Sequence, residues 1–154
     1  MRRLFILVVT ALLGVATFSA NAATGRVAKV LPHFLDLKGR HSLSPSLYDR
    51  DAYQAQLRKH PEQRSALRFD VLWRARGANG KLKLRAELRG IVQGNHPRQT
   101  TLESEVEASQ SGVSRWTSLT LAGEDYKNFG EVTAWRVTLW DGEKLVGEQK
   151  SFLW

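Results

Sequence analysis

Two runs of alternating apolar and polar residues flank an Asn-Gly pair, and this arrangement constrains the fold more than any other feature of the chain. Apolar residues occupy every second position in residues 67–75 and again in residues 82–88. Such alternation is typical of strands that have one face on a core and the other in water. Asn79 and Gly80 both tolerate a positive φ, so the pair predicts a tight hairpin between these strands.

Further segments predict strands, although none of them is as regular. Pro32 cannot donate to a ladder, so residues 26–37 predict one or two short strands interrupted at that proline. The other predicted strands are residues 102–107, 116–121, 132–140 and 145–154, with loops at 94–97 and 123–130 and a turn at Asp141-Gly142. Strands at this spacing, with no helices alternating between them, predict a mainly β fold, an antiparallel β-sandwich.

A short helical insertion is predicted near residues 46–60. Ser44 or Ser46 is suited to cap its start, and Asp49 lies in the first turn, where negative charge is favourable. Arg58 and Lys59 lie at its end, where positive charge is favourable.

The C-terminal hairpin, from Val132 onward, resembles the last two strands of fibronectin type III and other immunoglobulin-like domains. This resemblance implies an immunoglobulin-like sandwich whose second and third strands lie in different sheets. The Asn79-Gly80 turn predicts instead that these two strands form one direct hairpin, so the combined expectation is a variant topology.

The first 22 residues have the order of a secretory signal: two arginines, an apolar run over residues 4–16, and Ala20-Asn21-Ala22. We therefore expect residues 1–22 to be a signal peptide and residues 23–154 to be a single domain. Removing Arg2 and Arg3 with this segment lowers the length from 154 to 132 residues and the formal charge from +8 to +6. The expected location is periplasmic or extracellular, which argues against nucleic acid as a partner. No later segment approaches transmembrane length, so we do not expect the mature chain to span a membrane.

The chain offers little for catalysis. It has no cysteine, no G-x-S-x-G or H-E-x-x-H motif, and no glycine-rich phosphate loop. Histidines and carboxylates do cluster in residues 33–51, but their spacing matches no known ligand pattern. That scatter comprises His33, Asp36, His41, Asp49 and Asp51. We expect no enzyme, no metal and no cofactor, and keep a metal-dependent enzyme built on His33 and His41 as the weakest alternative.

The predicted hairpin would concentrate positive charge on one face. A two-residue turn at 79–80 sets Arg76 opposite Lys83 and Arg74 opposite Arg85, and like charges directly opposite each other are destabilising. A bound anion would relieve this repulsion. The simpler interpretation is that an acidic strand lies alongside and pairs with the basic one through Glu103, Glu105 and Glu107.

The tryptophans offer a second possible binding surface. Trp73 and Trp135 fall on the apolar phase of their strands, so we expect them in the core. Trp116, Trp140 and Trp154 have no such assignment, and exposed indole rings stack on sugars. Partial burial at the sheet edges is the simpler interpretation of these three.

The sequence thus supports two functional hypotheses. The first is a secreted or periplasmic, non-catalytic module that binds a protein partner or another cell-envelope component, or that contributes to envelope structure. The second is a domain that binds a carbohydrate or an anionic polymer. The candidate ligand-binding residues for the second hypothesis are Arg74, Arg76, Lys83, Arg85, Trp116, Trp140 and Trp154.

Overall fold

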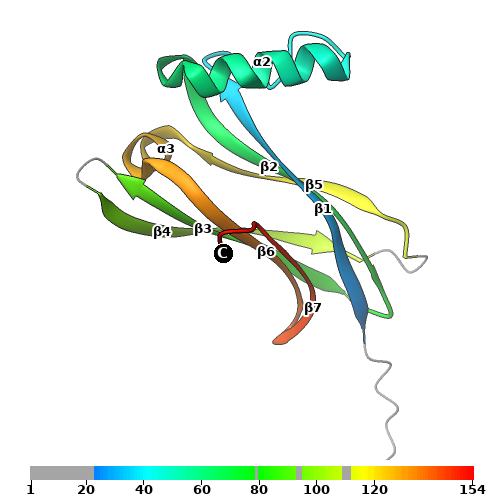
Figure 1. The fold of residues 1–154 in the computed structure, drawn as a ribbon. Coiled ribbons are helices and arrows are strands. Elements are labelled where there is room, and N and C mark those ends of the chain that lie inside the picture. The colour runs from blue at the N-terminus through cyan, green and yellow to red at the C-terminus, as the bar shows by residue number, and fades with distance from the viewer. Residues whose placement is uncertain (1–22, 79, 93–94, 109–111) are drawn as a thin grey trace, which may run out of the picture.

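The computed structural model describes residues 23–78, 80–92, 95–108 and 112–154, and within them the chain forms two antiparallel β-sheets packed face to face (Figure 1). Sheet A has the strand order β1-β2-β5, and sheet B has the order β4-β3-β6-β7. The strands are β1 (Thr24–Asp36), β2 (Arg64–Arg76), β3 (Lys81–Val92), β4 (His96–Glu107), β5 (Arg115–Ala122), β6 (Glu131–Asp141) and β7 (Lys144–Lys150). The predicted mainly β, antiparallel sandwich is confirmed. The expected signal peptide, residues 1–22, lies outside the described residues.

The predicted hairpin between residues 67–76 and 81–89 is wrong, because its two strands belong to different sheets. β2 pairs with β1 and β5, whereas β3 pairs with β4 and β6. Both edges of each strand are therefore occupied, and the connection at residues 77–80 crosses from one sheet to the other. Gly77 and Gly80 have positive φ angles of 71° and 121°, so glycine at 80 serves a crossing rather than a two-residue turn. Asn79 lies outside the described residues.

β1 continues through Pro32 instead of being interrupted there. Pro32 is paired in register with Phe69 of β2. β1 is the edge strand of sheet A, so it forms a ladder of hydrogen bonds on one side only. A proline, which has no N–H to donate, is tolerated in such a strand. The result is one continuous strand of 13 residues.

The predicted helical insertion is confirmed as α2 (Leu47–Lys59), which lies across the upper ends of β1 and β2 (Figure 1). Ser46 is its N-cap, and the Ser46 side chain accepts a hydrogen bond from the backbone N–H of Asp49. Leu57, near the end of this helix, has a fully buried side chain. Gln54 is also buried, and it exchanges two hydrogen bonds of 2.9 Å with the backbone N–H and C=O of Phe34.

Three other boundaries differ from the sequence prediction. Residues 123–130 are not simply a loop, because they contain the short helix α3 (Gly123–Phe129), and a 3-10 turn (Pro61–Gln63) follows α2. β4 begins at His96 and includes Pro97, whereas the sequence predicts a loop at these two residues. β7 ends at Lys150, so residues 151–154 are not part of the last strand.

The core lies between the two sheets and uses the alternating apolar positions predicted for β2 and β3. Phe69, Val71, Trp73, Leu84 and Leu88 are almost completely buried there. Trp135 is only partly buried, and its ring makes an edge contact with that of Phe69 at 6.3 Å between centroids.

The sheets approach each other most closely where β1 passes β7. A Cβ atom on Gly147 would lie 2.9 Å from the backbone nitrogen of Val27, and one on Gly25 would lie 2.9 Å from a methyl carbon of Val146. Glycine is required at this corner because the strands are in close contact.

Candidate functional site

The seven residues predicted to bind a ligand do not form one surface. Because β2 and β3 belong to different sheets, Arg74 and Arg76 lie on sheet A, while Lys83 and Arg85 lie on sheet B. Trp116 lies on sheet A with Arg74 and Arg76, because it belongs to β5. Trp140 of β6, paired with Lys83, goes with the second.

The basic residues of sheet B are neutralised by the acidic strand β4, as the simpler interpretation predicted. The Arg85 guanidinium and the Glu103 carboxylate lie 2.7 Å apart, and the Lys81 ammonium lies 2.8 Å from the Glu105 carboxylate. Lys83 lies 3.7 Å from Glu103. This face is therefore a ladder of ion pairs with no large surplus of positive charge.

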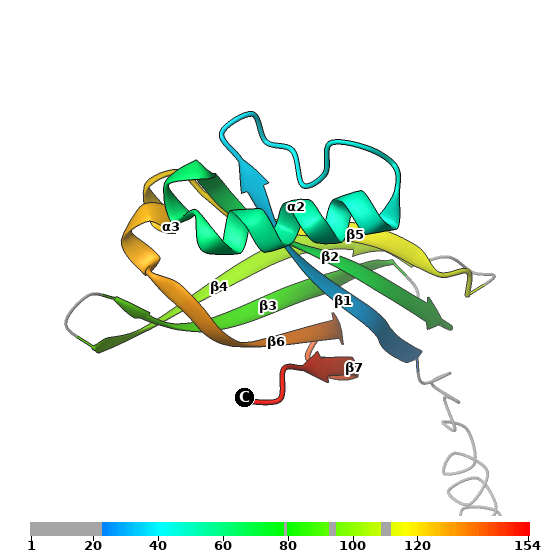
Figure 2. The same cartoon turned by 45° about the horizontal axis from the view of Figure 1, so that its top comes forward.

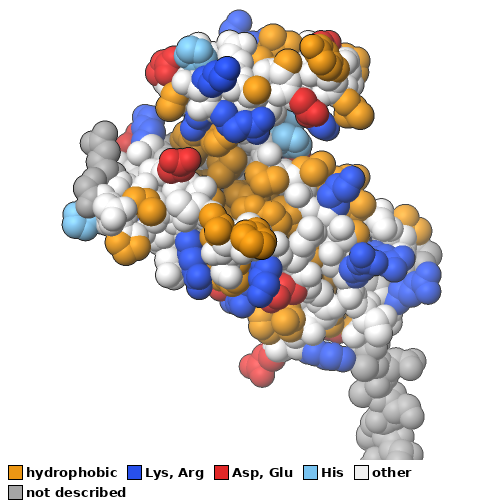
Figure 3. All heavy atoms as spheres, in the orientation of Figure 1, with side chains coloured by type: hydrophobic (Ala, Val, Ile, Leu, Met, Phe, Trp, Pro, Cys, Tyr) orange, Lys and Arg blue, Asp and Glu red, His pale blue; other side chains and the backbone are white. Residues whose placement is uncertain are grey.

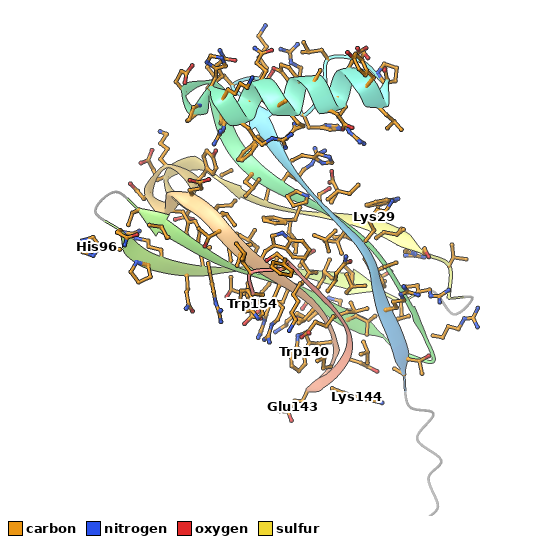
Figure 4. The ribbon with its side chains drawn as sticks, in the orientation of Figure 1. Lys29, His96, Trp140, Glu143, Lys144 and Trp154 are labelled. Atoms are coloured by element: carbon orange, nitrogen blue, oxygen red, sulfur yellow. The ribbon has the colours of Figure 1, made fainter. Side chains whose placement is uncertain are left out.

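Two tryptophans lie half-buried on the same outer face of sheet B (Figure 4). Trp140 borders a shallow hollow of about 250 Å³ together with Lys83, Arg85 and Glu143. Trp154 lies under a guanidinium, with the Arg89 carbon 3.9 Å from its ring centroid. Arginine thus already covers one ring, and the indole N–H of Trp140 is engaged by the Thr138 hydroxyl at 2.8 Å.

Sheet A carries a different surface on its lower half, which we call the basic patch: Arg26, Lys29, Arg74, Arg76 and Trp116. The alternation of β2 buries Trp73 and Ala75, so Arg74 and Arg76 point outward. The register places Arg26 directly opposite Arg74, and sets both Lys29 and Trp116 opposite Leu72. Directly opposite residues share a face, so all five side chains lie on the outer face. Figure 4 shows Lys29 pointing away from sheet B.

The charges of the basic patch are not balanced within the sheet. Among the described residues, none of the four basic side chains forms an ion pair, whereas three of the four basic groups along β3 have a carboxylate beside them. Arg26, Arg74 and Arg76 instead surround a hollow of about 340 Å³ (Figure 3 shows basic side chains gathered at this end of β1 and β2). The side chain of Trp116 is 54% exposed. The arrangement suits an anion with a stackable ring or apolar face beside it.

Sequence reasoning found three of these five residues and missed Arg26 and Lys29. The available signal was their alternation with Val27 and Val30 in the N-terminal strand. That signal is hidden by a bulge at Ala28, which shifts the register between Val27 and Lys29.

A second polar cluster lies on the upper half of sheet A, around Asp70. This carboxylate is bonded by His33 at 3.0 Å, by the Ser118 hydroxyl at 2.6 Å and by Arg68 at 3.0 Å. Burial alone would raise the pKa of Asp70, but these three partners outweigh it and hold the pKa well below its usual range. Asp70 is thus a fully engaged structural anion.

His33 and His41 do come together, with ring centroids 5.1 Å apart. Arg68 lies between His41 and Asp70, with its guanidinium 3.1 Å from the Nδ1 atom of His41 and 3.0 Å from the Asp70 carboxylate. Burial and the Arg68 charge lower the pKa of His41. A fixed cation in this position disfavours a metal ion, and no group of three suitable ligands occurs among the residues that the structure describes. Two of the carboxylates in the predicted cluster are engaged elsewhere. Asp36 forms an ion pair with Arg40, and Asp51 forms one with Arg50.

A cleft of about 360 Å³ opens where the sheets separate beneath α2 (Figure 3). Its apolar wall includes Phe34, Phe69 and Trp135, and Arg58 and Arg64 lie at its upper rim. The Arg64 guanidinium stacks on the Phe34 ring at 4.1 Å and donates to the last carbonyls of α2, those of Leu57 and Arg58. Sequence reasoning missed this cleft, because its lining comes from strands of both sheets and from the end of α2, which are far apart in the sequence.

None of the helices in the described part of the chain combines the length and the hydropathy needed to cross a bilayer.

Comparison with known proteins gives the fold and nothing more specific. No protein-family model matches the sequence, and no curated protein matches it. The chain is similar to a crystal structure from Akkermansia muciniphila, with a TM-score of 0.53 and 12% identity, over 84% of this chain and 70% of that one. At this level of identity the likeness concerns the architecture alone.

Proposed function

We propose that the protein is an exported, non-catalytic β-sandwich module that binds an acidic polysaccharide through the basic patch. One observation carries this proposal: Arg26 lies directly opposite Arg74 and lines a hollow with it and Arg76, and no carboxylate in the described part of the chain pairs with these arginines. Like charges paired across strands cost stability. A surface that keeps such a pair is explained by an anion that binds there.

The class of anion follows from the neighbours of the arginines. Trp116 is exposed on the same face, and an indole ring packs against the C–H face of a sugar. Arginine presents a planar fork of donors that matches a carboxylate or sulfate group. Uronic-acid or sulfated sugar chains combine both features. The expected export of the chain favours such polymers over nucleic acid.

The remaining parts of the proposal rest on the sequence. We expect residues 1–22 to direct export and to be removed, leaving the domain in the periplasm or outside the cell. We also infer that the sandwich is of the immunoglobulin-like or fibronectin type III-like class. This is supported by the division of β2 and β3 between two sheets, which removes the reason to expect a variant topology. The missing catalytic motifs support a binding role rather than an enzymatic one.

The test compares matched arginine variants in binding to polygalacturonate, with neutral dextran as the uncharged polymer. Arg74→Gln and Arg26→Gln remove charges from the basic patch, whereas Arg85→Gln removes one that is already paired with Glu103. We expect the first two to weaken binding to polygalacturonate several-fold and to flatten its dependence on salt, because fewer counterions are released. Equal effects of all three substitutions, or binding to dextran, would contradict the proposal.

The cleft supports a protein partner as the second candidate function. Ser151 lines the cleft, and the two residues that follow, Phe152 and Leu153, are exposed just outside it. A continuous apolar surface inside and outside a groove is typical of protein interfaces. Thr133→Trp would fill the mouth of the cleft, and Thr120→Trp on sheet A is its control. A protein captured from envelope extract by the wild type and the control, but not by Thr133→Trp, would support this function.

A further inference from the structure

The upper end of the molecule exposes four large apolar side chains, which we call the apolar tip: Leu37, Leu43, Leu47 and Tyr48. They are 72%, 60%, 67% and 82% exposed. They lie on the loop between β1 and α2 and on the first residues of that helix. Figure 2 shows this loop as the uppermost segment, and Figure 3 shows hydrophobic side chains gathered at this end. The loop is therefore the outermost part of the protein in this direction.

The loop is held firmly at its start, so the exposure is not the result of a loose segment. The Asp36 carboxylate accepts hydrogen bonds of 2.8 Å from the backbone N–H groups of Lys38 and Arg40, and one of 2.7 Å from the Tyr53 hydroxyl. Burial alone would raise the pKa of Asp36, but these bonds and the Arg40 guanidinium hold it well below its usual range. Asp36 thus remains charged and keeps the turn closed.

The second half of the loop is fixed as well. The Gln54 amide donates to the carbonyl of His41 at 2.8 Å, and Arg68 contacts the ring of the same histidine. Ser44 donates to the Asp49 carboxylate at 2.6 Å. Hydrogen bonds that order a loop while it points leucines into water indicate a surface built to be covered.

The charges beside the apolar tip show what would cover it. Lys38 and Arg40 follow Leu37 in the chain, Arg50 lines one shallow hollow with Leu43 and Leu47, and Arg58 and Lys59 follow at the far end of α2. The acidic groups on these elements are Asp36, Asp49 and Asp51, with Glu62 after the helix, and Asp36 and Asp51 are paired with Arg40 and Arg50. With Arg64 added, residues 36–64 at this end of the molecule have six basic and four acidic side chains, a surplus of two positive charges.

We propose that the apolar tip inserts into the headgroup region of an anionic lipid surface. A protruding loop with leucines and a tyrosine at its end, framed by basic residues, matches the interface of such a membrane: apolar groups enter the acyl boundary and cations contact lipid phosphates. A soluble protein partner would need a concave site for this convex end. This site is separate from the basic patch and from the cleft, so it stands or falls independently of the proposed function.

The first experiment measures co-sedimentation of the chain, residues 23–154, with vesicles of phosphatidylglycerol mixed with phosphatidylcholine. We expect binding to these vesicles and at least about tenfold weaker binding to phosphatidylcholine alone, since each basic residue near an anionic surface contributes about 1 kcal/mol. The double variant Leu43→Ser, Leu47→Ser should bind at least tenfold more weakly because it loses two inserted side chains. Leu145→Ser, at an exposed leucine on β7, is the matched control and should bind as the wild type does.

A second experiment reports which part of the protein enters the membrane. The chain has no cysteine, so Leu43→Cys accepts a single environment-sensitive fluorophore such as nitrobenzoxadiazole. We expect its emission to rise and shift to the blue on anionic vesicles, while the same label on Glu143→Cys, at the far end of the molecule (Figure 4), does not change. The proposal is overturned by the absence of vesicle binding, by binding that survives the double serine substitution, or by a label at position 43 that stays in water. The last two outcomes would show adsorption through the basic patch alone.

Discussion

Replacing Arg74 with glutamate should make the protein more stable and remove its affinity for anionic polymers. Arg74 lies directly opposite Arg26 in the β1–β2 ladder and lines the same hollow as Arg76. Arg74→Glu therefore converts a like-charge pair into an opposite pair without altering the buried face of β2.

The magnitude follows from cross-strand pairs. An opposite-charge pair stabilises an antiparallel sheet by about 0.2–1 kcal/mol, and a like-charge pair costs a similar amount. Exchanging one for the other should raise the free energy of unfolding by about 1 kcal/mol, or roughly 2–5 °C in Tm for a domain of this size. In about 1 M salt, where the Debye length falls to roughly 3 Å, most of the gain should disappear.

The assay is urea unfolding at low and high salt, accompanied by polygalacturonate binding. Arg85→Glu is the control, because Arg85 is paired in register with Glu103 and contacts it at 2.7 Å. That substitution should lower stability by a similar amount. The reasoning is refuted if Arg74→Glu leaves stability unchanged or lowers it at low salt, or if it retains full affinity for the polymer.

Three further predictions concern the scaffold. Gly130→Ala should destabilise the fold by at least about 2 kcal/mol in urea unfolding, because Gly130 has a φ of 82° and an added Cβ would clash with the carbonyl of Ile91. Gly123→Ala is the control: Gly123 also has a positive φ but faces open space, so the substitution should cost only about 1 kcal/mol. Equal costs for the two substitutions would contradict this prediction. Leu57→Ala should cost about 2–5 kcal/mol, since Leu57 is fully buried under α2, and a smaller loss would mean that α2 is not docked as described. The low pKa of Asp36 contributes stability that is complete above the unfolded-state value of about 3.9 and is lost progressively as the pH falls below it; Asp36→Asn should therefore be less stable than the wild type at pH 7 and show a flatter loss in acid, and parallel curves would refute this linkage.

Periodicity in the sequence was sufficient to identify most strands and the core. In β2 and β3 the alternation of Phe69, Val71 and Trp73, and of Leu84 and Leu88, marks the faces that are buried in the structure. The helical insertion was also predictable, because capping and charge at its ends are local properties. Ser46 needs only Asp49 three residues away to act as a cap.

Pairing between strands was not predictable in the same way. An Asn-Gly pair favours a tight turn locally, but two strands with buried faces gain as much from packing across the core as from pairing edge to edge. Here each of β2 and β3 already has two neighbours, so the turn signal was overridden. That one change separated Arg74 from Arg85 and united Arg74 with Arg26, so the acidic strand neutralises only the half of the predicted basic face that lies on β3. The cleft and the apolar tip depend on tertiary placement and left no comparable pattern in the sequence.

Because β1 continues through Pro32 without a break, its length sets the distance between the basic patch and the apolar tip. Arg26 lies near one end of the strand, and the apolar tip begins directly after its last residue, Asp36. An extended strand rises about 3.3 Å per residue, so roughly 30 Å separates the two surfaces. At physiological ionic strength electrostatic fields decay over about 8 Å. With the tip in an anionic membrane, a polymer bound to the basic patch would lie several screening lengths from that membrane. The continuous strand β1 would therefore let one protein hold two negatively charged partners that otherwise repel each other.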